Sequence, residues 1–323
     1  YTTYGFERNP FTNQHKIQTA YYFATSGYEI KYQGEFANII GKLNLKINTN
    51  FQSPNYTFNF FGFGNETNNF EDDFGLDYNR VKVREFLFNP SLVYRAYGGS
   101  QFCFGISYES IEVENTINRF VTNSPQLPSY IFNSNQFGSV KTKFEFENID
   151  NKAYPTLSFN SSFEMGYKMN LNQNNKGYSY LIPELSISHK LEPSGKLVLA
   201  SKIKSQINFG NNFEFYQAAS IGGDNGLRGY RNQRFTGSSY VYQNTDLRYS
   251  FDKVKTKLMP LRFGLFGSFD YGRVWLDGED SNKWNNSYGG GFFISRVDVL
   301  TTNLGVYKSI DGIRIAFSLG FEF

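Results

Sequence analysis

The chain has 323 residues and is rich in aromatic side chains, with 35 Phe and 24 Tyr, a bias that favours strands over helices. Its 32 basic and 29 acidic residues form no long run of one sign, which argues against nucleic acid as a partner. Cys103 is the only cysteine, so a disulfide within the chain and a thiolate metal cluster are both excluded.

Apolar and polar residues alternate along most of the chain, which is typical of β-strands because successive side chains point to opposite faces. In residues 41–51, for example, Leu43, Leu45 and Ile47 alternate with polar side chains. The alternation predicts about fifteen strands, in chain order at residues 1–8, 14–25, 27–38, 41–51, 79–95, 100–113, 135–147, 154–169, 178–190, 195–209, 236–251, 260–275, 286–295, 299–308 and 312–323.

The predicted strands and their connections favour a membrane barrel over a soluble sandwich. Several strands exceed ten residues, which suits a tilted crossing of a bilayer, whereas no stretch approaches the about 18 apolar residues of a membrane helix. The long connections, at residues 52–78, 114–134, 210–235 and 276–285, all fall on one side, and most short turns fall on the other. Outer-membrane barrels show this asymmetry, with short periplasmic turns and long outer loops. We therefore predict one all-β domain over residues 1–323, an antiparallel transmembrane β-barrel in contact with the lipid bilayer.

The number of predicted strands is odd, although single-chain bacterial barrels have an even number. We therefore expect a 16-stranded barrel whose first strand lies upstream of Tyr1. On this interpretation the residues form the carboxyl-terminal part of a longer chain, with a periplasmic or passenger domain preceding them.

A glycine-rich segment between two long predicted strands carries an arginine. Residues 222–235 read GGDNGLRGYRNQRF, in which Arg228 follows Leu227. Counting alternate positions along the next two strands places Asp246 and Asp270 on the face opposite the apolar side chains, toward a barrel lumen. A guanidinium in a lumen costs several kcal/mol unless it is paired, so these carboxylates are candidate partners.

Three stretches occur in an order that resembles a known family: GGDNGLRGY with FTG after it, then NTDLRYSF, then GLFGSFDYGRVW. The sequence is similar to the barrel-assembly superfamily, which contains BamA, TamA and the two-partner-secretion translocators and is also called the bacterial surface antigens. The resemblance is strongest from about residue 195 to the end. It implies a loop motif that folds into the lumen, formed by Leu227, Arg228, Gly229 and Tyr230.

The resemblance also implies roles within this motif. Arg228 would reach Asp246 and Asp270 through bidentate pairing, which lysine cannot reproduce. Gly229 would let the backbone turn tightly against the wall, and Tyr230 would pack there. The alternative is a solvated loop with an unpaired arginine.

The final predicted strand, residues 312–323, resembles the signal by which the assembly machinery recognises its own clients. Its expected apolar face contains Phe317, Leu319, Phe321 and Phe323. Gly320 is a candidate kink in this strand.

We identify no enzyme active site, no metal site and no cofactor motif in the sequence. His15 and His189 fall near predicted turns far apart in the chain, where a solvated histidine is expected. Glu71, Asp72 and Asp73 lie in a long outer loop, where they either bind calcium or keep the loop soluble.

The resemblance implies a protein of the outer membrane of a Gram-negative bacterium that inserts or translocates client outer-membrane or secreted proteins. Two alternatives stay open. The barrel could anchor or export a fused upstream lipase or phosphatase, and residues 53–67, SPNYTFNFFGFGNET, resemble the phosphatase-fused type. It could also be a diffusion porin, although a lumen plugged by residues 210–235 argues against that.

Overall fold

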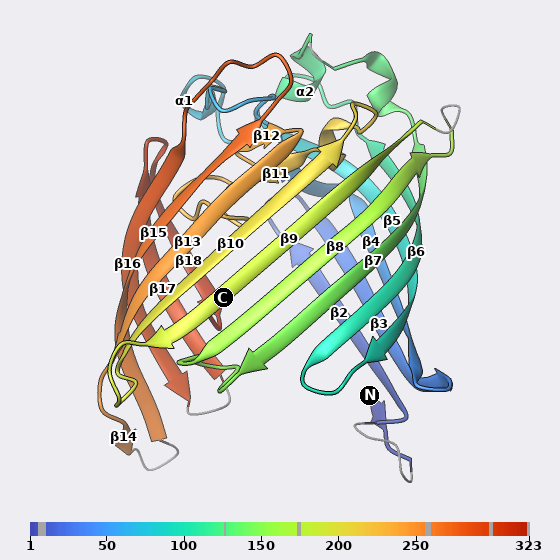
Figure 1. The fold of residues 1–323 in the computed structure, drawn as a ribbon. Helices are drawn as coiled ribbons and strands as arrows, with labels where there is room; N and C mark the ends of the chain where they lie inside the picture. Colours follow the sequence, from blue (N-terminus) through green and yellow to red (C-terminus); the bar gives the residue numbers. More distant parts are fainter. Residues whose placement is uncertain (6–10, 126, 173–175, 256–259, 297–299, 322–323) are drawn as a thin grey trace.

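The structure is a computed structural model that describes residues 1–5, 11–125, 127–172, 176–255, 260–296 and 300–321. Its main feature is one antiparallel sheet that curls into a barrel (Figure 1), in which every wall strand pairs with its neighbours along the chain. The wall strands are β1 (Thr2–Thr3), β2 (Asn13–Tyr22), β3 (Gly27–Ile40), β4 (Leu43–Asn59), β5 (Arg80–Arg95), β6 (Ser100–Val113), β7 (Asn135–Ile149), β8 (Ser158–Asn170), β9 (Gly177–Lys190), β10 (Leu197–Phe209), β13 (Ser239–Ser250), β15 (Pro260–Trp275), β16 (Asn285–Arg296), β17 (Leu300–Ser309) and β18 (Gly312–Leu319).

The connections between the wall strands contain short elements. The two strands β11 (Ala219–Ile221) and β12 (Phe235–Gly237) pair with each other, and β14 (Val254–Lys255) pairs with β15. The helical turns are α1 (Glu71–Phe74), α2 (Phe120–Asn123) and two 3-10 turns at Ser129–Phe132 and Phe215–Gln217. None of the described helices is long and apolar enough to cross a membrane.

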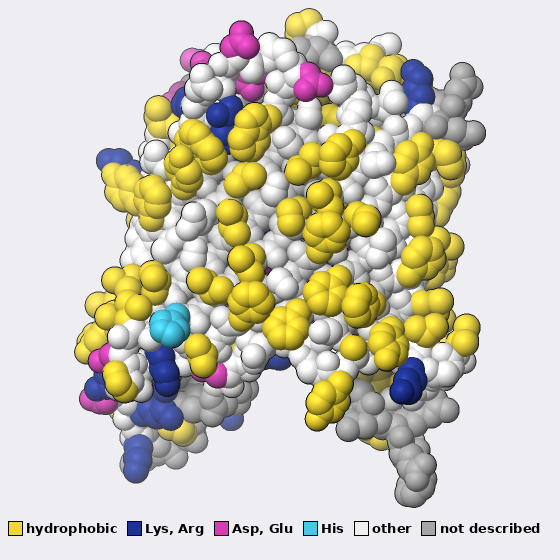
Figure 2. Space-filling view, in the orientation of Figure 1, with side chains coloured by type: hydrophobic (Ala, Val, Ile, Leu, Met, Phe, Trp, Pro, Cys, Tyr) yellow, Lys and Arg dark blue, Asp and Glu magenta, His cyan; other side chains and the backbone are white. Residues whose placement is uncertain are grey.

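The two faces of the wall differ in polarity because side chains alternate along each strand. In β15, Leu265 and Phe269 are 53% and 51% exposed on the outside. Asp270 of the same strand points to the inside and is fully buried. Figure 2 shows hydrophobic side chains spread over the strand wall, with charged side chains gathered toward its two ends. An apolar outside around a polar inside is the pattern of a transmembrane barrel rather than of a soluble sheet.

The long connections lie at one end of the barrel, the upper end in Figure 1, as the sequence predicts. They are held together there by a buried apolar cluster that joins three loops to the ends of the strands. The cluster contains Phe60, Val81, Val83, Val113, Val121, Ile131 and Phe215. The upper mouth of the barrel is therefore covered by packed loops.

The predicted strands agree with the wall to within three residues except at four places. The strand expected at 154–169 begins only at Ser158, so Tyr154 lies in the preceding turn. The strand expected at 41–51 continues to Asn59, with a register shift opposite β5 between Gln52 and Tyr56. The strand expected at 1–8 is represented only by the two residues of β1, and residues 6–10 lie outside the described part. The strand expected at 312–323 ends at Leu319.

The ends of the sheet are β1 and β18, and no hydrogen-bonded ladder joins them among the described residues. Most of β2 and all of β18 therefore have one edge without a partner strand in this part of the chain. The sixteenth strand upstream of Tyr1 stays a prediction.

Candidate functional site

The loop between β10 and β13 folds back on itself before it reaches the lumen. The pairing of β11 with β12 forms its base, and the backbone N–H of Leu227 donates to the carbonyl of Gly222 at 2.8 Å, which closes the turn. Gly226 has a φ of 105°, and a Cβ there would lie 2.5 Å from the ring of Tyr242. A side chain at this position is excluded by both conformation and space.

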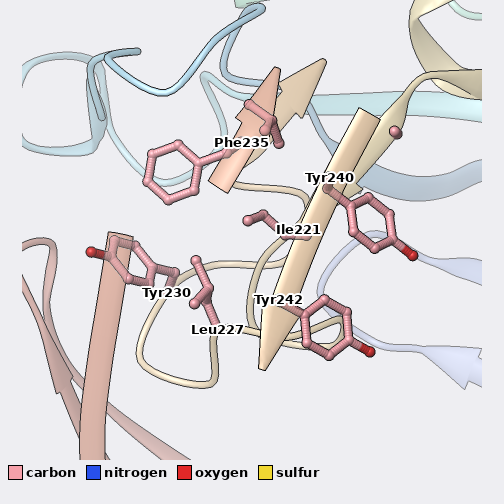
Figure 3. Packing of buried hydrophobic residues seen from close by; sticks show 8 residues of the cluster. Ile221, Leu227, Tyr230, Phe235, Tyr240 and Tyr242 are labelled. Carbon is pink, nitrogen blue, oxygen red and sulfur yellow. The ribbon is translucent and has the colours of Figure 1, made fainter. Parts of the chain in front are cut away.

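Apolar side chains of the loop pack against the wall and fix its position. Leu227 is fully buried and Tyr230 is 2% exposed. Figure 3 shows them gathered with side chains of the loop base and of β13 into one cluster, which contains Ala219, Ile221, Leu227, Tyr230, Phe235, Tyr240, Tyr242 and Val274.

This packing directs Arg228 toward two carboxylates of neighbouring wall strands. Its Nε donates to Asp270 Oδ1 at 3.0 Å, and its Nη2 donates to Asp270 Oδ1 at 2.6 Å and to Asp246 Oδ1 at 2.9 Å. The backbone N–H of Arg228 also donates to Asp270 Oδ2, at 3.0 Å. The structure thus brings together the three charged residues that the sequence singled out.

Neighbouring polar groups hold the two carboxylates in place. Asp270 accepts hydrogen bonds from Asn244 Nδ2 at 2.7 Å and Ser287 Oγ at 2.9 Å. Asp246 accepts one from Ser268 Oγ at 2.8 Å. Both aspartates have no exposed surface, so these bonds replace the water that burial removed.

The network also determines the charge state of the loop. Burial by itself would lower the pKa of Arg228, but Asp246 and Asp270 outweigh it and raise the pKa above its ordinary value. The guanidinium of Arg228 therefore keeps its charge beside the two carboxylates.

Gly229 lies where the loop approaches β16 and β17. Its N–H donates to Ser287 Oγ at 3.1 Å, and its carbonyl accepts from Ser309 Oγ at 2.8 Å. A Cβ at this position would lie 2.6 Å from the Cβ of Ser287 and 3.1 Å from the backbone of Lys308. Only glycine fits between these two strands.

The structure contains two further arginine anchors in the loop that the sequence analysis did not identify. Arg231 forms a salt bridge with Glu71 of α1. Arg234 is 4% exposed, and its Nε lies 2.5 Å from Asp311 in the turn between β17 and β18. Arginines at intervals of three residues, at 228, 231 and 234, could have indicated a series of anchors in the loop. The spacing does not show that Glu71 and Asp311 are the partners of the second and third.

The expected apolar face at the chain end needs a correction. Phe317 and Leu319 point outward and are 66% and 61% exposed, but Phe321 is only 9% exposed and lies inside the barrel. Gly320 has a φ of 84°, which breaks the strand alternation and turns the chain inward. Phe323 lies outside the described residues.

The two histidines and the acidic residues from Glu71 to Asp73 lie in regular secondary structure. His15 lies in β2, where its ring contacts the hydroxyl of Tyr32 at 2.9 Å, and His189 lies in β9, so each is a strand residue rather than a turn residue. Glu71 and its acidic neighbours begin α1. Among the described residues no three His, Cys, Asp or Glu side chains are grouped in a way that could hold a metal ion.

Comparisons with known proteins agree with this architecture. Residues 133–292 match the family model of the haemolysin secretion/activation proteins ShlB, FhaC and HecB. The fold is similar to BamA from Haemophilus ducreyi lacking POTRA domains 1–3, with a TM-score of 0.62 and 14% identity over 99% of this chain and 74% of that chain. It is also similar to CdiB from Escherichia coli, with a TM-score of 0.56 and 9% identity over 95% of this chain and 59% of that chain. No curated protein matches in sequence.

The fold and its arginine-bearing loop define an outer-membrane β-barrel whose lumen holds an inward-folded loop. The chain shares its fold with BamA and CdiB, and just under half of it, residues 133–292, matches the family of the haemolysin secretion/activation proteins. It spans a smaller part of the CdiB chain, 59%, than of the BamA fragment.

Proposed function

We propose that this barrel inserts or translocates client proteins at the outer membrane, with a secreted or outer-membrane polypeptide as its partner. The observation that carries the proposal is the lumen loop fixed by Arg228 between Asp246 and Asp270. A loop held inside the lumen by ion pairs suits a conduit that must be opened for each client. Its ion pairs fix one closed position of the loop, and they can form again when the client has left.

The lumen has the polarity that an unfolded polypeptide needs. Cationic and anionic side chains alternate around its wall, as in the salt bridges of Lys168 with Glu109 and of Lys204 with Glu184. Two polar cavities of about 510 and 680 Å³ lie along these walls. Mixed charges and water offer hydrogen bonds to an extended backbone without binding one sequence tightly.

The edges of β2 and β18 support the same function. Neither has a partner strand over most of its length among the described residues. Unpaired N–H and C=O groups are costly in lipid and act as templates for strand addition. A client strand could therefore pair with the free edge of β2 or of β18 while its outward side chains contact the bilayer.

The apolar outside supports a position of the barrel in the lipid bilayer. We propose that the covered end with the long loops faces outward and that the short turns face the periplasm, as in other outer-membrane barrels. The protein should then require detergent for extraction and should fold into lipid vesicles.

The experiment is a deletion of the gene in its native host, followed by quantitative proteomics of the outer membrane and the secreted fraction. We expect one or more outer-membrane or secreted proteins to disappear. The wild-type gene should restore them, as should Arg231→Gln, whereas Arg228→Gln at an equal level in the membrane should not. Unchanged proteomes on deletion would refute the proposal.

Anchoring of a fused enzyme is a second candidate because residues 53–67 resemble the phosphatase-fused type. The sequence preceding Tyr1 distinguishes it, since metal-ligand motifs there would favour an enzyme. A diffusion porin would instead give a steady ion conductance in planar bilayers. The loop fixed in the lumen argues against a porin.

A further inference from the structure

A second guanidinium lies beside the first in the lumen. Arg248 of β13 has no exposed surface, and its Nη2 lies 3.5 Å from Asp246 Oδ2. Arg228 of the loop uses the other oxygen of this carboxylate, Oδ1, at 2.9 Å. One buried carboxylate is therefore shared by the lumen loop and by a wall arginine.

Arg248 in turn contacts the end of the chain. Its guanidinium carbon lies 3.9 Å from the centroid of the Phe321 ring, well within the range of a cation–π interaction. Phe321 reaches this position because the chain turns inward at Gly320. The turn is held by the Gly320 N–H, which donates to the carbonyl of Thr301 at 2.7 Å, and by Asn303 Nδ2, which donates to the carbonyl of Gly320 at 2.7 Å.

A turn from a distant part of the wall packs against the same ring. Residues 150–157 connect β7 to β8, which are separated from β18 by six or more strands in the order of the sheet. Tyr154 of this turn is 3% exposed. Its ring lies edge-on to Phe321 at 5.9 Å and is stacked on Phe293 at 5.1 Å.

The turn is held by its own side chains and is attached at its far side to β17. Asn151 Oδ1 accepts from the N–H groups of Ala153 and Tyr154, and Asp150 Oδ1 accepts from the N–H of Thr156. The carbonyl of Ala153 accepts from Thr301 Oγ1 of β17 at 2.6 Å. The turn thus crosses the lower mouth in a conformation that its own side chains determine.

We propose that Arg248 and Tyr154 are positioning residues that hold Phe321 inside the barrel, and that Asp246 couples this contact to the lumen loop. We call Arg248, Tyr154 and Phe321 the C-terminal latch. When Arg228 leaves Asp246, the carboxylate keeps Arg248 as its cationic partner among the described residues and draws it away from the Phe321 ring. Displacement of the loop therefore loosens the end of β18, and by reciprocity a released chain end weakens the hold on the loop.

The inference rests on the proposed function, in which the β18 edge receives a client. A latched chain end fixes the last residues of β18 in the lumen and restrains that edge. Release of the latch would free the edge in the same step that displaces the loop from the lumen.

Hydrogen exchange measured by mass spectrometry on the full-length protein in nanodiscs tests the latch. We expect Arg248→Gln and Tyr154→Ala to raise the exchange rate of residues 318–321 at least tenfold, read from overlapping peptides that begin after Ala316. Tyr154→Phe keeps the ring and should match the wild type. Wild-type exchange of residues 318–321 in both Arg248→Gln and Tyr154→Ala would overturn the latch.

The coupling is tested in the same assay by two substitutions in the loop. Arg228→Gln should raise exchange of residues 318–321, whereas Arg234→Gln should affect the outer turn near Asp311 and leave residues 318–321 unchanged. A purely structural weakening of the loop would make the two variants alike. That outcome, or an unchanged chain end in Arg228→Gln, would overturn the coupling through Asp246.

This readout requires no client. A failed client assay would refute the proposed function while leaving the latch measurement intact, and the converse also holds.

Discussion

Replacement of Arg228 provides the most direct test of how the lumen loop is held. In Arg228→Gln, Asp270 keeps its bonds from Asn244 and Ser287, and Asp246 keeps Arg248 as a neighbour. Asp270, however, loses its cation while it remains fully buried. Removal of one partner from a buried ion pair typically costs about 3–5 kcal/mol. The remaining hydrogen bonds place the expected loss in the free energy of unfolding near the lower limit, at about 3 kcal/mol.

Arg228→Lys separates charge from geometry. An ammonium group keeps the attraction and can donate, but it lacks the planar fork with which the guanidinium engages Asp270 through Nε and Nη2 while Nη2 also reaches Asp246. The loss of one charge-assisted hydrogen bond predicts a cost of about 1.5–3 kcal/mol. We therefore expect stability to decrease in the order wild type, Arg228→Lys, Arg228→Gln.

The assay is urea unfolding of protein refolded into lipid vesicles, followed by the fluorescence of Trp275 and Trp284 near the loop end of the barrel. Arg231→Gln is the matched control, because Arg231 is as exposed as Arg228, at 21%, but its partner Glu71 is 29% exposed whereas Asp246 and Asp270 are buried. A pair with a solvated partner contributes only about 0–1 kcal/mol. The reasoning is wrong if Arg228→Lys lies within about 0.5 kcal/mol of the wild type, since that is below any charge-assisted bond. It is also wrong if Arg228→Gln costs no more than Arg231→Gln.

Three further predictions concern other parts of the barrel. Gly229→Ala should displace the loop and lower stability by about 1–3 kcal/mol in the same unfolding assay, whereas Gly267→Ala, where a Cβ would meet nothing within 4 Å, should be tolerated. Leu265→Lys, on the outer face of β15, should cost about 2–4 kcal/mol in vesicles because a cation would face the hydrocarbon, and a neutral result would contradict lipid contact there. The turn at 150–157 should loosen in acid: although burial raises the pKa of Asp150, hydrogen bonds from Thr156 bring it below its usual value. The ionised Asp150 carboxylate therefore stabilises the turn above its usual pKa of about 3.9, and this stabilisation is lost as pH falls through its lower pKa in the folded protein. Hydrogen exchange of the turn, corrected for the intrinsic effect of pH, should stay constant from pH 7 to about 5 and rise below about 4.

Much of the wall could be predicted from the sequence because strand alternation is a local rule. Counting alternate positions was enough to place Asp246 and Asp270 inside, and the structure buries both. The rule failed where the backbone departs from a regular strand. Gly320 adopts a positive φ and changes the face of the next residue, so Phe321 lies inside although the pattern places it outside.

The second failure also has a local cause. The predicted strand ended at residue 51, and the segment that follows contains Pro54, which lacks the N–H that a ladder needs. The structure accommodates it at the register shift of β4, where the ladder with β5 is already interrupted. The strand could therefore continue to Asn59.

The contact of Arg228 with Asp246 and Asp270 was expected from the family resemblance, but other contacts between distant segments could not be predicted. Nothing in the spacing of Tyr154, Arg248 and Phe321 shows that they meet, because their contact depends on how far the turn at 150–157 reaches across the mouth. The same holds for the pairing of Arg234 with Asp311. Such contacts depend on the curvature of the whole sheet, which a local pattern does not specify.

The kind of interaction that holds the loop is informative about function. The barrel wall is built from backbone ladders, which in lipid have no alternative partners and cannot exchange. Besides the apolar packing of Leu227 and Tyr230, the loop is held by ion pairs, of Arg228 with Asp246 and Asp270 and of Arg234 with Asp311. Buried ion pairs fix geometry strictly but add little net stability, since desolvation offsets much of their attraction. A loop held in this way takes one defined position at rest, yet water or a client strand can replace its partners, which is what a conduit that opens on demand requires.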